Sequence, residues 1–422
     1  MFGHDFCLVS ALLSVADAVL PTVLLLAVSR LLWEFRWSIT RDKTCKLPLP
    51  QGSMGWPLVG ETFHWLFQGS SFHISRREKH GKVFKTHLLG KPLIRVTGAE
   101  NIRKILLGEH TVVCTQWPQS TRIILGPNTL VNSVGDLHKR KRKVLAKVFS
   151  RGASRHLRLQ DVVEFDIAKW CNKTGFVEVT SAAESLTFRI TVGVVLGMHL
   201  KDQQITYLSK ALEQLMNNLF SLPIDTPVSG LRKGIRAREI LHSAMEKIIE
   251  EKLKKQQASD YCDAFDYMLS SARENDYELT MQELKVNLKT PNLKILCASF
   301  LLHPGYQIPK GWSVMYSIRD THETAEAYQN PEFFDPDRFC VGREESKSER
   351  FSYVPFGGGV RRCIGRELAL IVLKTLAVEL LATADCTLAT QTYPRMQTVP
   401  IVHPVNGLHV FFNYRTQGIE RN

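Results

Sequence analysis

The sequence predicts a mainly helical protein with a small β region and an N-terminal membrane anchor. Three observations lead to this prediction: an apolar stretch from Phe6 to Trp33, helical periodicity between residues 138 and 275, and short alternating runs near residues 83–96 and 404–412. The chain has 422 residues, of which 44% are hydrophobic and 23% charged. This composition allows a large folded core and excludes general disorder.

The first element is the apolar stretch, and about 20 such residues are enough to cross a bilayer. We expect residues 1–45 to form a membrane anchor with a basic flank. The positive charges follow the stretch, which places the body of the protein in the cytosol: Arg36, Arg41, Lys43 and Lys46. Asp17 and Pro21 interrupt the apolar run, so a tilted or partly interfacial segment is one alternative, and a cleaved signal peptide is another.

The second element, residues 46–60, is predicted to be a stiff hinge between anchor and body. It carries prolines at positions 48, 50 and 57 and glycines at positions 52 and 55, and this combination disfavours a helix. Residues 83–96 follow as two strand-like runs around Gly90, which predicts a hairpin.

Amphipathic helices are predicted next. Apolar residues recur three and four apart in residues 181–198, 203–220 and 232–255, and residues 366–384 repeat the pattern with a stripe of Leu368, Val372, Leu376 and Leu380. A capping box at residues 280–283 predicts one more helix, which Pro291 should end. Asn406-Gly407 predicts a closing hairpin.

The overall charge bears on the kind of partner. The formal charge of +13 and the pI near 9.3 indicate affinity for an acidic partner, which could be nucleic acid, an anionic membrane or an acidic protein. The nine cysteines form no CxxC pair, so we expect reduced thiols facing the cytosol.

The clearest chemical motif is the run Phe356-Gly-Gly-Gly359-Val-Arg361-Arg-Cys363-Ile-Gly365. A cysteine thiolate presented by a loop can ligate iron, and glycines on either side allow backbone to approach a flat macrocycle. Phe356 can shield the sulfur from water, and Arg361 can pair with a haem propionate. The helix that begins near Gly365 favours the thiolate, because its positive dipole end lies beside the sulfur. The alternative is a buried structural cysteine beside a glycine-rich helix entry.

These features resemble those of the cytochrome P-450 superfamily and, within it, of the retinoic acid hydroxylases (family 26 type). The cysteine loop and residues 334–339, which are similar to the family's meander element, carry the superfamily resemblance. Longer runs at residues 45–55, 83–101, 125–129 and 308–322 carry the resemblance to the branch. Together they cover residues 1 to about 285 and 305 to 415. The resemblance implies a P-450-like fold with a haem-thiolate domain at residues 61–422.

The resemblance also implies the reaction and its participants. We expect hydroxylation of all-trans retinoic acid with O2, as part of retinoid catabolism, by haem b with Cys363 as the iron ligand. Electrons would come from NADPH through an acidic, membrane-bound flavoprotein reductase. The implied location is the endoplasmic reticulum membrane, in contact with lipid, with the body facing the cytosol.

His138 and Arg142 match the family's helix whose side chains hold haem propionates, and their four-residue spacing puts both on one helix face. They belong to the basic run at residues 138–143, for which a nucleic-acid or nuclear-localisation patch and a solvated helix face are the alternatives. Because an anchor is predicted and no nucleic-acid motif is present, we favour propionate binding with reductase docking and expect no nucleic-acid partner.

Three residues are candidates for substrate binding. Trp117 falls in the family's variable loop above the haem, and Phe220 falls near the end of a helix that would cover the pocket. Plain core packing is the alternative for both aromatic residues. Arg95 is the candidate cation for the retinoate carboxylate.

The chain departs from the family between Lys285 and Gly305. About a hundred residues of the family pattern are absent there, including the central distal helix with its oxygen-activating motif and the Glu-x-x-Arg helix. The only Glu-x-x-Arg match, Glu100 to Arg103, belongs to another helix, so Arg338 of the meander element should lack its family partners. We therefore expect an internally truncated fold, with a deletion near residues 286–304, and assign no catalytic residue.

Two hypotheses follow from this departure. The sequence could be an incomplete gene model of a complete monooxygenase. Alternatively, the chain could be a catalytically inactive, truncated isoform with at most residual haem or retinoid binding.

Overall fold

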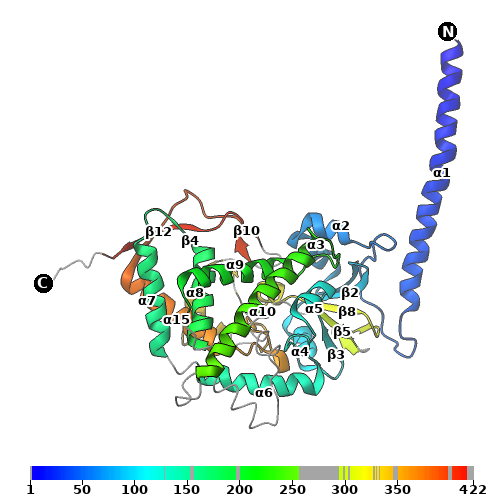
Figure 1. Ribbon diagram of the computed structural model, residues 1–422. Coiled ribbons are helices and arrows are strands. Elements are labelled where there is room, and N and C mark those ends of the chain that lie inside the picture. Colours follow the sequence, from blue (N-terminus) through cyan, green and yellow to red (C-terminus); the bar gives the residue numbers. More distant parts are fainter. Residues whose placement is uncertain are drawn as a thin grey trace. The chain divides into compact units, whose positions relative to one another are not determined.

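The computed structural model is shown in Figure 1. It describes residues 2–127, 129–152, 156–195, 200–255, 294–297, 300–302, 305–326, 328, 330–331, 333–345, 350–397 and 402–415. The chain divides into two compact units. Unit 1 comprises Met1–Gln116 and Leu293–Val360, and unit 2 comprises Trp117–Asn292 and Arg361–Asn422.

Unit 1 begins with one long helix, α1 (Phe2–Ile39), in which Pro21 is accommodated. Its last turns belong to the core, because Trp33 and Trp37 are buried with Trp312 and the indole N–H of Trp33 donates to the Met54 carbonyl at 3.1 Å. Trp33, expected at the end of the apolar anchor stretch, is thus a core residue of unit 1. Among the helices within the described ranges, none is both long enough and apolar enough to cross a membrane.

A five-stranded sheet forms the centre of unit 1. Its strand order is β1 (Val83–Leu88), β2 (Lys91–Val96), β8 (Ser313–Tyr316), β5 (Lys294–Cys297) and β3 (Val113–Gln116). Strands β1 and β2 form the hairpin that the sequence predicted, with Val83 opposite Val96. Strand β5 pairs antiparallel with both β3 and β8, so part of the segment between Lys285 and Gly305 completes this sheet.

The remaining elements of unit 1 are short. They are α2 (Thr62–Gln68), α3 (Ser70–His80), α4 (Ala99–Leu107), β6 (Phe300–Leu302), β7 (Tyr306–Ile308), α13 (Ile318–Glu323) and the 3-10 turn η3 (Pro336–Phe339). The proline-rich stretch predicted to be a hinge is bonded to the unit: the Gln307 amide donates to the Pro48 carbonyl at 3.0 Å, and the Lys85 amide donates to the Gln51 carbonyl at 2.8 Å.

Unit 2 is mainly helical, as predicted. Its helices are α5 (Gln119–Leu125), α6 (Gly135–Gly152), α7 (His156–Cys171), α8 (Val179–Ile190) with the π-helical turn η1 (Thr191–Val195), α9 (Asp202–Asn218), α10 (Gly230–Lys255) and α15 (Arg366–Thr383). Val372, Leu376 and Leu380 of the predicted stripe on α15 pack against the buried face of α7, where Leu159 and Val163 lie. The helix predicted to begin at residue 280 lies outside the described residues.

The predicted closing hairpin is wrong in its pairing. Strand β11 (His403–Pro404) pairs with β10 (Met396–Gln397), whereas β12 (His409–Tyr414) lies between β4 (Val177–Glu178) and β9 (Ala384–Leu388). The turn at Asn406-Gly407 therefore connects two different sheets. Alternation and a turn signal identify strands, but the pairing depends on distant partners such as β4.

Candidate haem-thiolate site

The glycine-rich half of the cysteine loop ends unit 1 and is shaped by the end of α4. A Cβ at Gly359 would lie 2.0 Å from the Leu106 carbonyl oxygen, and the residue has a φ of +62°, so glycine is required on both counts. Gly357 also has a positive φ, of +69°, and its amide donates to the Val354 carbonyl at 2.9 Å. The half-buried Phe356 precedes this turn. The glycines therefore serve the packing of the loop on α4 within unit 1.

The cysteine half of the loop begins unit 2. The 3-10 turn η4 (Gly359–Arg361) leads to Cys363, a half-buried free thiol. Gly365 is the N-cap residue of α15, so the thiol lies just before the first turn of that helix. Its position before a helix N-terminus matches what the sequence predicted for an iron ligand.

Two arginines connect the cysteine half of the loop with α6 and with the segment just before it. The Arg361 guanidinium donates to the Ser133 carbonyl at 2.8 Å, and the Arg142 guanidinium donates to the Arg362 carbonyl. Unit 2 therefore brings Arg142, which is distant in the sequence, to the segment that carries Arg361 and Cys363, and all three residues were predicted to contact one cofactor.

The basic run on α6 is divided between the interior and the solvent. His138 and Lys141 are each 2% exposed and Arg142 is half-buried, whereas Lys139, Arg140 and Lys143 are exposed. The alternative interpretation of the basic run as a solvated helix face therefore holds for only part of residues 138–143. Lys141 was not singled out from the sequence, although its three-residue spacing from His138 places it on the same face.

Positive charge accumulates around Cys363. The pKa of Arg142 lies below its ordinary value, because burial disfavours the charged guanidinium and Arg361 and Arg362 repel it, while attraction to the Cys363 thiolate acts in the opposite direction. A half-buried thiol near arginines that repel one another is suited to bind a cofactor that carries both a metal ion and carboxylates. A haem has these features, so the residues present fit it.

The three candidate substrate residues lie in different settings. Trp117 is 4% exposed and its indole N–H donates to the Val131 carbonyl at 3.2 Å, which is the contact of a core residue in unit 2. Phe220 is half-buried just after α9. Arg95, in unit 1, is buried and ion-paired with Asp320 at 3.1 Å. The retinoate role of Arg95 stays a prediction, which this internal pair disfavours.

The meander element corrects one expectation. Arg338 is buried, yet it is not left without acceptors: it contacts Glu345 at 3.3 Å and donates to the carbonyls of Asp335, Asn330 and Phe333. The loop itself satisfies this arginine. The Glu-x-x-Arg match at Glu100 to Arg103 lies on α4 with both side chains exposed, as expected for a run that belongs to another helix.

The chain is similar to several known proteins. The profile of the cytochrome P-450 family matches residues 50–291 and 300–409. Cytochrome P-450 26B1 of Homo sapiens is 46% identical over 98% of this chain and 96% of its own length, and cytochrome P-450 26C1 of Homo sapiens is 44% identical over 100% and 99%. The solved structure of a retinoic acid-bound cyanobacterial CYP120A1 is similar with a TM-score of 0.78 and 28% identity, covering 88% of this chain and all of that one.

The length of such alignments shows that this chain lacks residues of its relatives. The alignment with cytochrome P-450 26B1 of Xenopus tropicalis has 489 positions, which exceeds the 422 residues of this chain by 67, so at least that many positions of the relative have no counterpart here. The family profile is interrupted at residues 292–299, within the segment where the sequence departs from the family.

Proposed function

This chain belongs to the cytochrome P-450 family, and from that premise we propose that it is a haem-thiolate monooxygenase that hydroxylates retinoic acid. The contact of Arg142 with the Cys363 loop carries the proposal, because it places a second guanidinium, besides that of Arg361, near a thiol that can ligate iron. The resemblance to retinoic acid hydroxylases and the retinoic acid-bound structural neighbour support the choice of substrate.

The chain's own residues supply the binding site for the cofactor. Cys363 would ligate the iron of haem b, and Arg361, Arg142 and His138 would hold its propionates. When bound, the thiolate-ligated haem supplies oxygen activation for insertion into a C–H bond, with electrons delivered from NADPH by a reductase. Phe356 would shield the sulfur from water, and Gly359 and Gly365 would let the backbone approach the flat macrocycle.

For the substrate, Trp117 and Phe220 would contact the polyene of retinoic acid. Arg95 remains the candidate partner of the carboxylate, although binding would require exchange of its Asp320 contact.

The exposed half of the α6 basic run suits an acidic redox partner. Lys139, Arg140 and Lys143 point to solvent while Arg142 reaches the cysteine loop. We propose that the reductase docks on this face. We also propose that the protein is located at the endoplasmic reticulum membrane, with its body facing the cytosol. The exposed apolar residues of α1, among them Leu20, Leu24 and Leu25, support contact with lipid.

A second candidate function is retention of haem or retinoid without turnover. The 67 or more unmatched positions, the break in the family profile and strand β5 in place of the expected helices favour an internal deletion near residues 286–304. The deleted region would include the distal oxygen-activating motif, and a chain without it would be a truncated isoform.

Turnover distinguishes the two candidates. The purified, haem-loaded chain is incubated with NADPH, a microsomal P-450 reductase and all-trans retinoic acid, and oxidised retinoids are separated by chromatography, with Cys363→Ala as the control. Hydroxylated product that depends on Cys363 supports the monooxygenase. A retinoate-induced shift of the haem absorption without product supports the binding-only candidate, and the absence of both refutes the choice of retinoic acid as ligand.

A further inference from the structure

A polar pocket lies in unit 1, in a part of the chain that the haem site does not use. It is a cavity of about 320 Å³ between the end of α1, the loop before α2, and α3. Its lining residues are Arg30, Ser53, Gly55, Trp56, Glu61, His64, Arg76, Lys79 and His80. The volume lies at the lower end of the range of about 300–1,000 Å³ that is usual for small-molecule sites.

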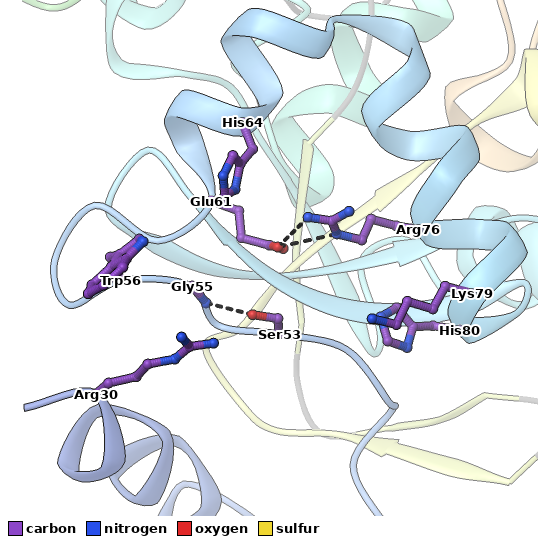
Figure 2. Close-up of a pocket in the computed structure, with 9 residues that line it drawn as sticks. All are labelled: Arg30, Ser53, Gly55, Trp56, Glu61, His64, Arg76, Lys79 and His80. Atoms are coloured by element: carbon purple, nitrogen blue, oxygen red, sulfur yellow. Dashed lines mark hydrogen bonds and ion pairs between the residues drawn. The ribbon is translucent and has the colours of Figure 1, made fainter. Parts of the chain in front are cut away.

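The only carboxylate in the lining is ion-paired within the protein. Glu61 accepts hydrogen bonds from Arg76 at 2.7 Å and 3.2 Å on one oxygen and from Thr86 at 2.7 Å on the other. Figure 2 shows the Glu61–Arg76 pair on one wall of the pocket. Glu61 therefore forms its ion pair with Arg76, and both of its carboxylate oxygens accept hydrogen bonds from within the protein.

Two cations of the lining are therefore uncompensated. Arg30 and Lys79 make no ion pair with any residue that the structure describes, and Figure 2 shows them entering from α1 and α3 on opposite sides. The pKa of His80 is lowered by burial and then by repulsion from Lys79 and Arg76, while attraction to Glu61 acts in the opposite direction, so the positive charge of the pocket disfavours a further proton. An anion between Arg30 and Lys79 would relieve this repulsion.

The elements that line the pocket also carry exposed apolar side chains. On α2, Phe63, Leu66 and Phe67 are exposed, the last by 87%, and on α1, Leu25 and Leu31 are exposed in the turns around Arg30. Trp56 in the lining is itself exposed, and the Arg30 guanidinium lies 5.7 Å from its ring centroid. A cationic cavity with apolar side chains on adjoining elements suits an amphipathic anion.

We propose that this pocket binds the phosphate head group of an anionic phospholipid, whose acyl chains lie along the exposed apolar side chains of α1 and α2. Arg30 and Lys79 contact the phosphate from opposite sides, and Trp56 lies at the level of the head group. The exposed apolar residues favour a lipid over free phosphate, which would leave them without a role. The inference adds head-group selectivity to the proposed membrane location and is independent of the oxidation chemistry.

The test compares binding of the full chain to sedimented vesicles of phosphatidylcholine alone and of phosphatidylcholine with phosphatidylserine. Each lysine or arginine near an anionic surface contributes about fivefold in binding, so the double variant Arg30→Ala/Lys79→Ala should lose roughly 10- to 30-fold in affinity for the anionic vesicles. Both side chains are exposed, so the variant should keep the wild-type melting temperature.

The matched control is Lys173→Ala/Lys210→Ala, which removes the same two charges from exposed positions of unit 2 and should bind the anionic vesicles like the wild type. An equal loss in both double variants would mean that diffuse charge, and not the pocket, binds the lipid. Equal wild-type binding to both kinds of vesicle would overturn the head-group site while leaving membrane association intact. Full displacement by inorganic phosphate at its own binding concentration would assign the pocket to free phosphate and overturn the lipid assignment.

Discussion

Replacement of Gly359 by alanine tests why the cysteine loop requires glycine. The residue has a φ of +62°, and the left-handed conformation costs an alanine about 1 to 2 kcal/mol relative to glycine. A Cβ at this position would also lie 2.0 Å from the Leu106 carbonyl oxygen, so the loop must move away from the end of α4. Overpacking of this kind costs about 1 to 3 kcal/mol more. We therefore expect Gly359→Ala to lower the free energy of unfolding by about 2 to 5 kcal/mol.

Gly357 is the matched control two residues earlier in the same turn. Its φ of +69° imposes the same conformational cost, but nothing lies within 4 Å of a Cβ placed there. Gly357→Ala should therefore cost only about 1 to 2 kcal/mol. The assay is urea unfolding of the full chain followed by circular dichroism, with the slopes compared to establish that the midpoints report stability. Equal losses in the two variants would refute the contact with Leu106 as the reason for the glycine.

Three further predictions concern ionisable side chains of unit 1. The pKa of His73 is lowered from 6.5 to about 3, first by burial and then by repulsion from Arg95. Between these two pH values the unfolded chain therefore binds a proton at His73 that the folded chain does not bind. Stability should fall by about 1.4 kcal/mol per pH unit between about pH 6 and pH 4, and urea titrations of His73→Phe should show a shallower slope; identical slopes would contradict this. Asp320→Asn strands the buried Arg95 and should cost about 3 to 5 kcal/mol in urea unfolding, a prediction that fails if the loss is below about 1 kcal/mol, the range of a surface ion pair. Glu345→Gln should cost about 2 kcal/mol in the same assay, because Arg338 keeps three carbonyl acceptors; a loss as large as that of Asp320→Asn would show that these carbonyls do not compensate.

Local patterns predicted much of the fold. The hairpin at residues 83–96 was predicted because alternation and a glycine turn act within a few residues, and α15 was predicted because its apolar stripe repeats at helical spacing. The structure also brings Arg142, a candidate from the sequence, to the Cys363 loop, to which Arg361 belongs.

Features that depend on distant contacts were not predictable from local patterns. The contact between Gly359 and Leu106 joins segments far apart in the chain, and the burial of Lys141 depends on how α6 packs. The acceptors of Arg338 were missed because the family pattern directed attention to an absent helix, whereas Glu345 lies seven residues away in the same loop. The partners of Gly359 and Lys141 are thus determined by tertiary packing, whereas those of Arg338 lie within eight residues of it and depend on the conformation of the loop.

The reduced carbon monoxide difference spectrum of the purified full chain tests the central claim most directly, because the absorption of the complex reports the ligand opposite carbon monoxide. If Cys363 ligates haem iron as a thiolate, the wild-type chain should show the thiolate-type Soret band, and Cys363→Ala should lose it while keeping the far-ultraviolet circular dichroism of the fold. A wild-type chain without that band, or a Cys363→Ala chain that retains it, would contradict the assignment of Cys363 as the iron ligand.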